Sequence, residues 1–230
     1  MNGRGTDEFL DTTFLRWWLE RVKMDFRDRR LRVVGIGGTL REGSTSLGAL
    51  RRSLGAAEEA GAQTELLDLR DLRLPMYEPG KPLEDYGGNV RGFVEAVREA
   101  DALLVSTAAY HGTLAGVTKN ALDFAQFLGR DERPYFDGKV VGVISTAGGD
   151  QAATNANGAM VHTVHALRGI VAPLMVAIPR TWQRSDGEGN ITDDGYAKRL
   201  DKLGRLVVEL AEKVGAEEPS RRAEPVGIAV

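Results

Sequence analysis

A glycine- and hydroxyl-rich segment near the start of the chain has the residue types that hold an anion. It runs from Gly37 to Ser46 and reads Gly-Gly-Thr-Leu-Arg-Glu-Gly-Ser-Thr-Ser. A β-branched apolar run, residues 31–36, precedes it, and Leu47, Leu50 and Leu54 follow at helical spacing. The segment therefore leads from a strand to a helix N-terminus, where unpaired N–H groups and the positive end of the helix dipole favour negative charge.

The residues that the segment lacks narrow the choice of anion. Ser44 stands where a nucleoside-triphosphate loop has Lys, and Leu40 stands where a dinucleotide fingerprint has its third glycine. The groups that remain suit a single phosphate monoester: the hydroxyls of Thr39, Ser44, Thr45 and Ser46, the backbone N–H groups and the guanidinium of Arg41. The alternative interpretation is an ordinary strand-to-helix turn with Ser46 as N-cap.

Two later segments carry a similar signal. Residues 106–124 include Gly112 and Gly116, which let the backbone approach a flat ligand, and Tyr110 and His111, which add planar groups with polar atoms. Residues 145–150 read Ser-Thr-Ala-Gly-Gly-Asp. Each of these segments follows an apolar run, as the first one does.

The elements that must position these segments alternate between strand and helix. We expect a doubly wound parallel sheet with right-handed crossovers, whose carboxyl edge gathers the unusual loops 37–46, 108–116 and 145–150. Pro173 interrupts the last strand, which indicates an edge position or a bulge. Asp68 ends the second strand and is interpreted as a loop cap. The expected strands are 31–36, 62–69, 101–107, 139–145 and 170–178, and the helices begin near Ser46 and span 90–99, the region around Met160 up to Gly169, and 193–214.

Composition excludes several kinds of chemistry. The 230 residues have no Cys, which rules out disulfides, thiolate catalysis and iron–sulfur clusters, and the three His residues lack neighbouring carboxylates, so we expect no metal site. A formal charge of −3 gives no general attraction to nucleic acid. Without an apolar stretch long enough for a bilayer or a signal-peptide core, we expect a cytoplasmic protein that binds neither membrane nor nucleic acid.

Three regions are expected along the chain. Residues 1–30 form an amphipathic helical extension, and its adjacent Trp17 and Trp18 are too apolar to leave in water, so we expect an arm that docks on another subunit. Residues 31–215 form the α/β domain. Residues 216–230 form a loose tail.

Taken together, the loops resemble those of the NAD(P)H-dependent FMN reductase family of flavodoxin-like proteins. That family has a phosphate loop similar to Gly-Ser-x-Arg-x-Gly-Ser, a Pro-x-Tyr segment ending in Lys-Asn-Ala-x-Asp-Trp after the third strand, and a glycine-bearing loop after the fourth. The likeness covers residues 31 to 178. This chain departs from the pattern at Ala108, His111 and Phe124, where the family has Pro, Asn and Trp.

The resemblance implies a five-stranded sheet of order 2-1-3-4-5 and an FMN site at its carboxyl edge. In that site the N–H groups of residues 110–112 and 148–149 stabilise charge on reduced flavin, and no catalytic acid, base or nucleophile is needed. By resemblance the FMN phosphate is held by Thr39, Arg41, Ser44, Thr45 and Ser46, the isoalloxazine ring is bordered by Ala109, Tyr110, His111 and Gly112, and the pyrimidine end of the ring meets the loop containing Ser145, Ala147, Gly148 and Gly149.

The function that the resemblance implies is hydride transfer from NAD(P)H to FMN and on to free flavin, a quinone or another acceptor. The implied partners are NAD(P)H, the acceptor, a flavin-dependent monooxygenase and further copies of the chain in a homodimer or homotetramer. The alternative is a flavodoxin-type electron carrier or flavin-binding module without nicotinamide turnover. Arg180 and Arg184 are the candidates for contact with the 2′-phosphate of NADPH.

Overall fold

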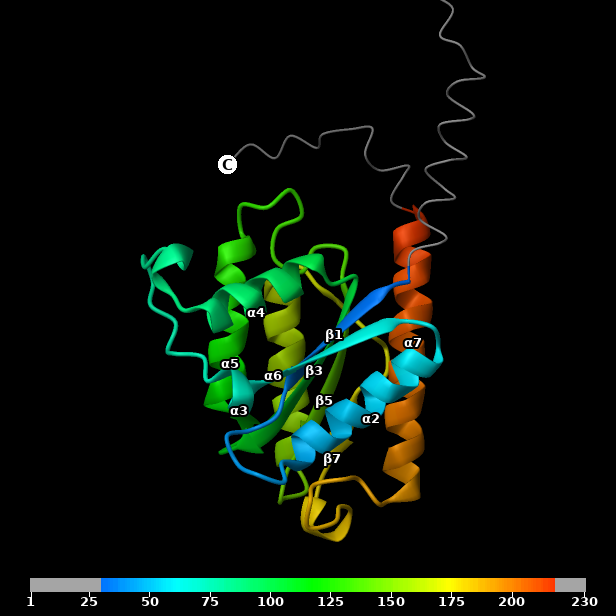
Figure 1. The fold of residues 1–230 in the computed structure, drawn as a ribbon. Coiled ribbons are helices and arrows are strands. Elements are labelled where there is room, and N and C mark those ends of the chain that lie inside the picture. The colour runs from blue at the N-terminus through cyan, green and yellow to red at the C-terminus, as the bar shows by residue number, and fades with distance from the viewer. Residues whose placement is uncertain (1–29, 218–230) are drawn as a thin grey trace, which may run out of the picture. The chain divides into compact units, whose positions relative to one another are not determined.

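The computed structural model describes residues 30–217, so residues 1–29 of the expected N-terminal extension and 218–230 of the expected C-terminal tail lie outside the described part. Residues 216 and 217, expected in the tail, belong to the last helix. A parallel sheet forms its centre (Figure 1), with β2-β1-β3-β5-β6 as the strand order. Because β6 and β7 are two pieces of the predicted fifth strand, this order confirms the expected 2-1-3-4-5 arrangement. The strands are β1 (Arg32–Gly37), β2 (Gln63–Asp68), β3 (Ala102–Tyr110), β4 (Thr113–Leu114), β5 (Val140–Thr146), β6 (Ile170–Val171) and β7 (Val176–Ile178).

The interruption that Pro173 predicts is present. β6 pairs with Val140 and Val141 of β5, and β7 pairs with residues 144–146 of the same strand. Four residues, 172–175, therefore lie opposite two residues of β5. Since Pro has no N–H group to donate to a ladder, this wide bulge at the edge of the sheet is where Pro can be accommodated.

Helices cover both faces of the sheet. The helices are α2 (Thr45–Glu59), α3 (Leu69–Leu72), α4 (Gly88–Glu99), α5 (Gly116–Asp123), α6 (Ala152–Ala166) and α7 (Asp194–Glu217), and 3₁₀ turns span Leu83–Asp85, Phe124–Leu128 and Thr181–Gln183. One face packs against α2 and α7, and the other packs against α4, α5 and α6 (Figure 1). Alternate strand residues serve the two layers, as the period of a strand requires: Leu103 and Val105 face one layer, and Ala102 and Leu104 face the other.

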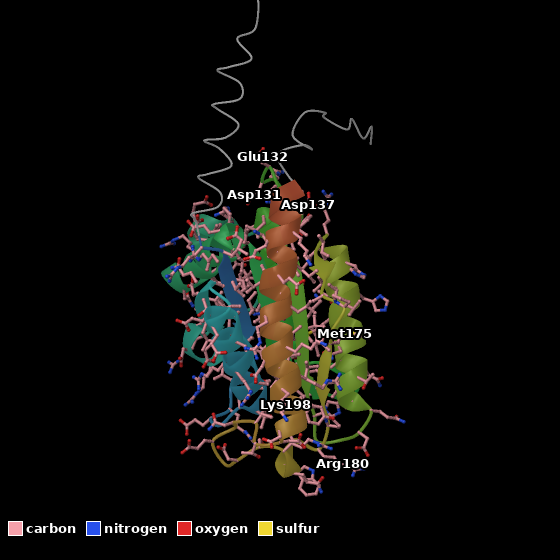
Figure 2. All side chains as sticks on the ribbon, turned by 90° about the vertical axis from the view of Figure 1, so that its right-hand side faces the viewer. Asp131, Glu132, Asp137, Met175, Arg180 and Lys198 are labelled. Atoms are coloured by element: carbon pink, nitrogen blue, oxygen red, sulfur yellow. The ribbon has the colours of Figure 1, made fainter. Side chains whose placement is uncertain are left out.

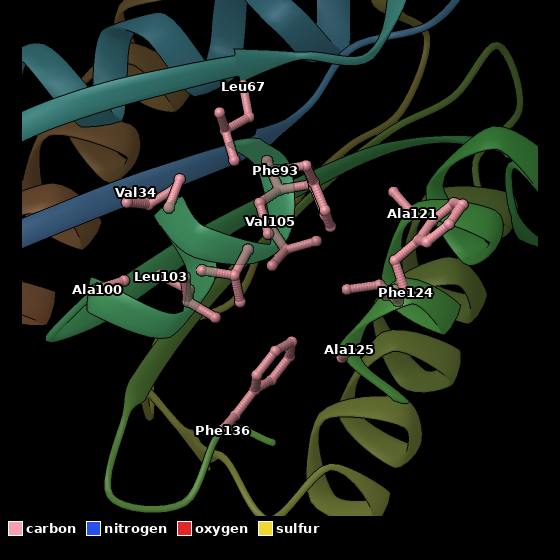
Figure 3. Packing of buried hydrophobic residues seen from close by; sticks show 14 of the residues in the cluster. Val34, Leu67, Phe93, Ala100, Leu103, Val105, Ala121, Phe124, Ala125 and Phe136 are labelled. Carbon is pink, nitrogen blue, oxygen red and sulfur yellow. The ribbon is translucent and has the colours of Figure 1, made fainter. Parts of the chain in front are cut away.

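Aromatic rings fill the core between the sheet and the second layer. Phe124 is fully buried, and its ring centroid lies 5.6 Å from that of Tyr77 and 5.3 Å from that of Tyr86 in edge-to-face contacts. Figure 3 shows Phe124 and Phe136 on the helical side of the cluster, facing Val34, Leu103 and Val105 of the sheet. This packing fixes α5 directly after the β3–β4 hairpin.

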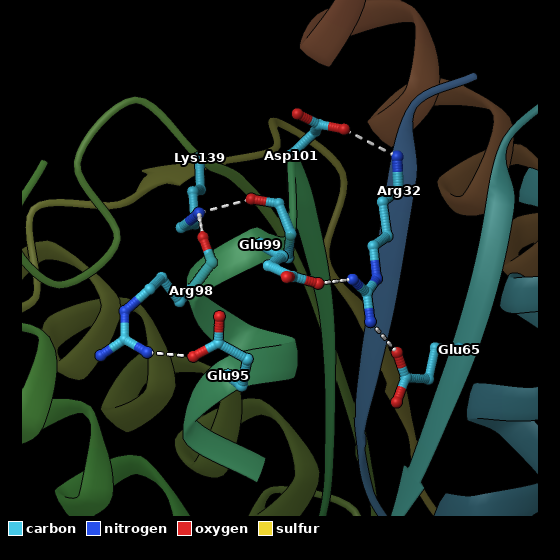
Figure 4. A network of polar contacts seen from close by, with 8 residues as sticks. Arg32, Glu65, Glu95, Arg98, Glu99, Asp101 and Lys139 are labelled. Atoms are coloured by element: carbon cyan, nitrogen blue, oxygen red, sulfur yellow. Dashed lines mark hydrogen bonds and ion pairs between the residues drawn. The ribbon is translucent and has the colours of Figure 1, made fainter. Parts of the chain in front are cut away.

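Charged residues connect the elements at the amino edge of the sheet (Figure 4). Arg32 on β1 pairs with Glu65 on β2 at 2.6 Å and with Glu99 at the end of α4. Lys139 is buried, and its Nζ donates to the carbonyl groups of Arg98 and Ala100, where the positive charge offsets the negative end of the α4 dipole. These contacts stabilise the edge opposite the predicted site. No helix within residues 30–217 combines the length and apolar character that a membrane span requires.

Helices α2 and α7 approach each other closely. The Ser53 hydroxyl on α2 donates to the Leu200 carbonyl at 2.9 Å, and Arg52 forms a two-pronged ion pair with Asp201 at 2.8 Å per contact. Gly204 lies at the crossing, where a Cβ would collide with the Ser53 carbonyl oxygen and meet the Ala57 nitrogen at 3.1 Å. The absence of a side chain at residue 204 therefore sets the distance between the two helices.

Replacing this glycine tests that constraint. We expect Gly204→Ala to lower the free energy of unfolding by about 1 to 3 kcal/mol, because the extra methyl group must push the helices apart. Gly55→Ala on α2 is the matched control: its Cβ would meet no atom within 4 Å, so the gain in helix propensity should stabilise the chain by about 0.5 to 1 kcal/mol. Urea denaturation of both variants measures the difference, and equal effects would contradict this account of the helix crossing.

Candidate functional site

The three predicted loops meet at the carboxyl edge of the sheet. β1, β3 and β5 are neighbouring parallel strands, so their following loops emerge at the same edge. Side chains near this edge connect the segments: the Ser106 hydroxyl on β3 donates to the Ser46 carbonyl at 2.8 Å, and the hydroxyl of Thr45 lies 3.5 Å from that of Thr146, the last residue of β5. The predicted convergence of these segments is therefore present.

The first loop ends at a capped helix. Ser44 is the N-cap of α2, with an extended backbone and a hydroxyl that accepts from Leu47 N at 3.4 Å. The N-cap that the alternative interpretation placed at Ser46 is wrong, because Ser46 already lies inside the first turn, where its hydroxyl is 3.0 Å from that of Ser44. The N-cap position two residues earlier brings the helix N-terminus closer to Arg41.

Unpaired donors line this loop. Among the described residues, nothing accepts a hydrogen bond from the N–H groups of Thr45 and Ser46, and the first turn of α2 has no acidic residue. Thr39 and Ser44 are buried, and the Thr39 hydroxyl accepts from Arg41 N at 3.3 Å.

The guanidinium of Arg41 is the cation of the loop. It is exposed and lies 3.3 Å from the Gly43 carbonyl oxygen, and no carboxylate in the described part of the chain forms an ion pair with it. Free N–H groups, hydroxyls and an unpaired cation around a helix N-terminus fit a phosphate monoester, as the FMN phosphate would require.

The second segment has a regular structure that the sequence did not indicate. Residues 108–116 were expected to form a loop after a strand that ends at residue 107, but β3 continues to Tyr110 and pairs with β4 in an antiparallel hairpin. His111 and Gly112 form its two-residue turn, with φ of 49° and 86°. Positive φ at both turn residues is the geometry that usually selects Asn-Gly, so His-Gly gave no clear hairpin signal.

The hairpin presents its tip to solvent on an anchored base. The Thr107 hydroxyl accepts from Ala115 N at 3.0 Å and lies 2.9 Å from the Thr118 hydroxyl, which joins the hairpin to the start of α5. Tyr110 is 53% exposed, and His111 and Gly112 are exposed as well. Ala109 is partly buried beside them. The tip therefore offers a planar ring and open backbone on a rigid support.

The third loop divides into a buried half and an open half. The Ser145 hydroxyl is buried and donates to the Ala153 carbonyl at 2.6 Å, so it fixes α6 and is not available to a ligand. Ala147 is buried and donates its N–H to the Ile178 carbonyl at 2.9 Å. Gly148 and Gly149 are exposed, and a Cβ on either would meet no atom within 4 Å. The backbone of these two glycines is therefore accessible.

A fourth loop, residues 184–190, also borders the site, although it was not among the three loops expected there. A Cβ on Gly43 would meet the Gly187 carbonyl oxygen at 3.0 Å, so this loop packs on the phosphate loop. Asp186 holds its shape by accepting from Asn190 N at 2.8 Å and Glu188 N at 2.9 Å. Hydrogen bonds from the Asn190 side chain and from these N–H groups lower the pKa of Asp186. The Asp-Gly-x-Gly pattern was the available signal for a tight turn.

Three carboxylates near the site have partners within the chain. Arg180 donates to Asp150 at 2.6 Å, and this hydrogen bond lowers the pKa of Asp150. The pKa of Asp193 is lowered by the Tyr196 N–H group and by the nearby guanidinium of Arg184. Asp68 is the cap that the sequence indicated, accepting from Arg70 N at 3.0 Å. Within residues 30–217 no group of three or more His, Asp or Glu side chains is arranged to hold a metal ion.

The comparisons with known proteins agree on one family of enzymes. The family model described as NADPH-dependent FMN reductase matches residues 31–183. The chain is 32% identical over 167 residues to an NAD(P)H-dependent FMN reductase of Pseudomonas aeruginosa, which covers 71% of this chain and 86% of that protein. It is 28% identical over 181 residues to an NADPH:quinone oxidoreductase of Arabidopsis thaliana, which covers 75% of this chain and 88% of the relative.

A solved structure shows the same fold. FerB, a flavoenzyme NAD(P)H:(acceptor) oxidoreductase of Paracoccus denitrificans, superposes with a TM-score of 0.64 at 23% identity, over 80% of this chain and 98% of that one. The expected flavodoxin-like architecture is thereby confirmed at the level of the fold.

The hairpin turn gives a prediction about stability. We expect His111→Val to lower the free energy of unfolding by about 1 to 2 kcal/mol, because a β-branched side chain is strained in the left-handed region. His111→Asn should not destabilise the chain, since Asn adopts this conformation readily. Urea denaturation of the two variants decides the matter, and equal losses would show that the conformation of residue 111 is not what limits the turn.

Proposed function

The chain belongs to the NADPH-dependent FMN reductase family, and on that premise we propose that it binds FMN and passes hydride from NAD(P)H to FMN and on to free flavin, a quinone or another acceptor. One observation carries this proposal. An anion cradle at the N-terminus of α2 lies at the same sheet edge as an exposed tyrosine hairpin and an open pair of glycines. A phosphorylated ligand with a flat ring system matches that combination.

Each part of the edge has a role in holding FMN. The phosphate binds the N–H groups of Thr45 and Ser46 and the guanidinium of Arg41, with the hydroxyls of Thr39, Ser44 and Thr45 beside them. The ring is bordered by residues 109–112 of the hairpin, and its pyrimidine end by residues 147–149. Ser145 contributes by fixing α6 rather than by touching the ligand.

The protein's contribution to the reaction is orientation and electrostatics. FMN, when bound, supplies the capacity to accept a hydride and to return reducing equivalents. The N–H groups at the hairpin tip and at Gly148 and Gly149 stabilise negative charge, and the planar groups of the hairpin orient a second ring against the first. No catalytic acid, base or nucleophile is required of the chain.

The proposal also concerns the oligomeric state of the protein. Asn120 on α5 accepts from Tyr77 N at 2.9 Å and donates to the Pro75 carbonyl at 2.8 Å, so the intervening Met76, which is 73% exposed, is held rigidly next to α5. We propose this segment beside α5 as the contact with a second copy in a homodimer or homotetramer. Light scattering of the purified chain should give two or four times the subunit mass of 25.0 kDa, and a single-subunit mass would refute the proposed assembly.

Two further proposals concern the protein's surroundings. Enzymes that reduce exchangeable FMN can supply a flavin-dependent monooxygenase, so such an enzyme is a proposed partner. The proposed location is the cytoplasm, where NAD(P)H is available to the reaction.

Flavin binding and flavin-dependent turnover test the proposed function. The purified full-length chain, titrated with FMN, should quench flavin fluorescence, and its oxidation of NADH or NADPH should depend on added FMN and a quinone acceptor. Arg41→Gln should raise the Kd for FMN about tenfold or more, because it removes a charge-assisted hydrogen bond to the phosphate. It should leave the affinity for riboflavin, which has no phosphate, unchanged.

The control for this variant lies on α7, away from the cradle. Arg205→Gln removes an exposed guanidinium that pairs with Glu59 at 3.1 Å, and it should bind FMN as the unchanged chain does. The proposal fails if saturating FMN shows no binding to the unchanged chain. Bound FMN with no NAD(P)H oxidation would instead favour the electron-carrier alternative.

A further inference from the structure

A short turn after β7 lies beside the open glycines of the third loop. It comprises residues 179–184, and its Thr181 N–H donates to the Ala147 carbonyl at 3.1 Å, next to Gly148. Arg180 in the same turn reaches Asp150, which follows Gly149, at 2.6 Å. Figure 2 shows Arg180 at the carboxyl edge, at the opposite end of the molecule from Asp131 and Glu132. The turn therefore extends the rim of the candidate site.

The turn is held in a conformation that its residues do not prefer. Arg180 has φ of 48° and ψ of 49°, the left-handed region that disfavours residues with a side chain. Its carbonyl accepts from Gln183 N at 2.9 Å, and the Thr181 carbonyl accepts from the Ser185 hydroxyl at 2.7 Å. Such strain persists only where the surroundings fix it, and it is concentrated at ligand sites. The Arg180 side chain is thus presented from a rigid base.

The two arginines that the sequence suggested for a 2′-phosphate differ in availability. Arg184 donates to the Pro179 carbonyl at 2.9 Å and to Asp193 at 2.7 Å, and its guanidinium lies 4.7 Å from the centroid of the Tyr196 ring. The guanidinium of Arg184 is therefore engaged by groups of the chain itself and has a structural role. Within residues 30–217 the Arg180 guanidinium pairs with Asp150 alone, and both side chains are at least half exposed. An exposed pair of this kind contributes little to stability and can exchange its carboxylate for another anion.

An exposed tryptophan accompanies Arg180. Trp182 is 69% exposed although it lies on a well-anchored turn. A large aromatic side chain in water is a ready surface for stacking a planar base, and this contact favours no particular base. Guanidinium and indole, two residues apart, together match a phosphorylated nucleoside.

We infer that Arg180 binds the 2′-phosphate of NADPH and that Trp182 stacks on its adenine, because their shared turn adjoins the Gly148–Gly149 backbone at the rim of the site. The inference rests on the proposed function and adds a preference for NADPH over NADH. Asp150 competes with the phosphate for Arg180 and limits that preference. A dianionic phosphate replaces the carboxylate as the partner of the guanidinium when NADPH binds.

Steady-state kinetics with both nucleotides test the assignment on the full-length chain saturated with FMN. Arg180→Gln should raise the KM for NADPH about tenfold more than the KM for NADH. Gln has an unbranched side chain as Arg has, so the strain of the left-handed conformation at residue 180 stays similar. Asp150→Asn should act in the opposite direction and lower the KM for NADPH, because it frees the guanidinium. Trp182→Ala should raise both KM values by a similar factor, since NADH and NADPH share the adenine. An unchanged ratio of KM values in Arg180→Gln overturns the inference.

Two control variants separate this site from other arginines. Arg205→Gln breaks an exposed ion pair with Glu59 at 3.1 Å, far along α7, and should change neither KM. Arg70→Gln removes a guanidinium that pairs with Glu42. Arg70 follows β2, which lies on the other side of β1 from β3 and its hairpin. If Arg70→Gln loses the preference for NADPH and Arg180→Gln keeps it, the 2′-phosphate binds at Arg70 and the assignment is overturned.

A binding measurement keeps the test independent of flavin chemistry. In calorimetry the unchanged chain should bind 2′,5′-ADP at least several-fold more tightly than 5′-AMP, and Arg180→Gln should abolish the difference. If the chain binds no FMN, the proposed function fails, yet this comparison still decides whether Arg180 recognises the phosphate. Equal affinities of the unchanged chain for the two nucleotides would refute the assignment even where FMN binds and turnover is normal.

Discussion

The position of the N-terminus of α2 is the constraint on which the rest of the site depends. The helix is fixed from three directions: the Ser106 hydroxyl on β3 binds the Ser46 carbonyl, Gly48 admits the backbone of Gly189, and Gly204 lets α7 approach. Two of these three contacts need a residue without a side chain, so they set the helix position by close approach of backbone rather than by adaptable side chains. An anion cradle built from N–H groups is only as well placed as its helix, and here the helix has little freedom to shift.

The two edges of the sheet divide stability from ligand binding. At the amino edge, charged groups are satisfied within the chain, as Lys139 and Arg32 illustrate. At the carboxyl edge, the Thr45 N–H group, the Arg41 guanidinium and the backbone of Gly148 remain open to a ligand. This asymmetry follows from the parallel fold, since the N-termini of helices that follow strands gather at one edge only.

The sequence was sufficient for the architecture because strand and helix periods are local signals, and even the break at Pro173 could be predicted from its missing N–H group. The details that escaped prediction depend on tertiary contacts. The hairpin turn was missed because His111 stands where Asn usually precedes Gly in such a turn. The alternative interpretation placed the cap at Ser46 because two serines in the same loop have equal capping propensity. The packing of residues 184–190 on Gly43 joins segments far apart in the chain, and no local pattern encodes that contact.

The divided last strand has a consequence for the behaviour of the protein at high concentration. An open sheet ends in unpaired N–H and C=O groups, which invite strands of other molecules to add on and begin aggregates. Here that border offers only a two-residue piece and a three-residue piece, separated by the segment that contains Pro173, so an incoming strand finds no continuous ladder to extend. The same interruption that appears as an irregularity of the fold thus protects this edge of the sheet, the one opposite β2, against the addition of strands from other molecules.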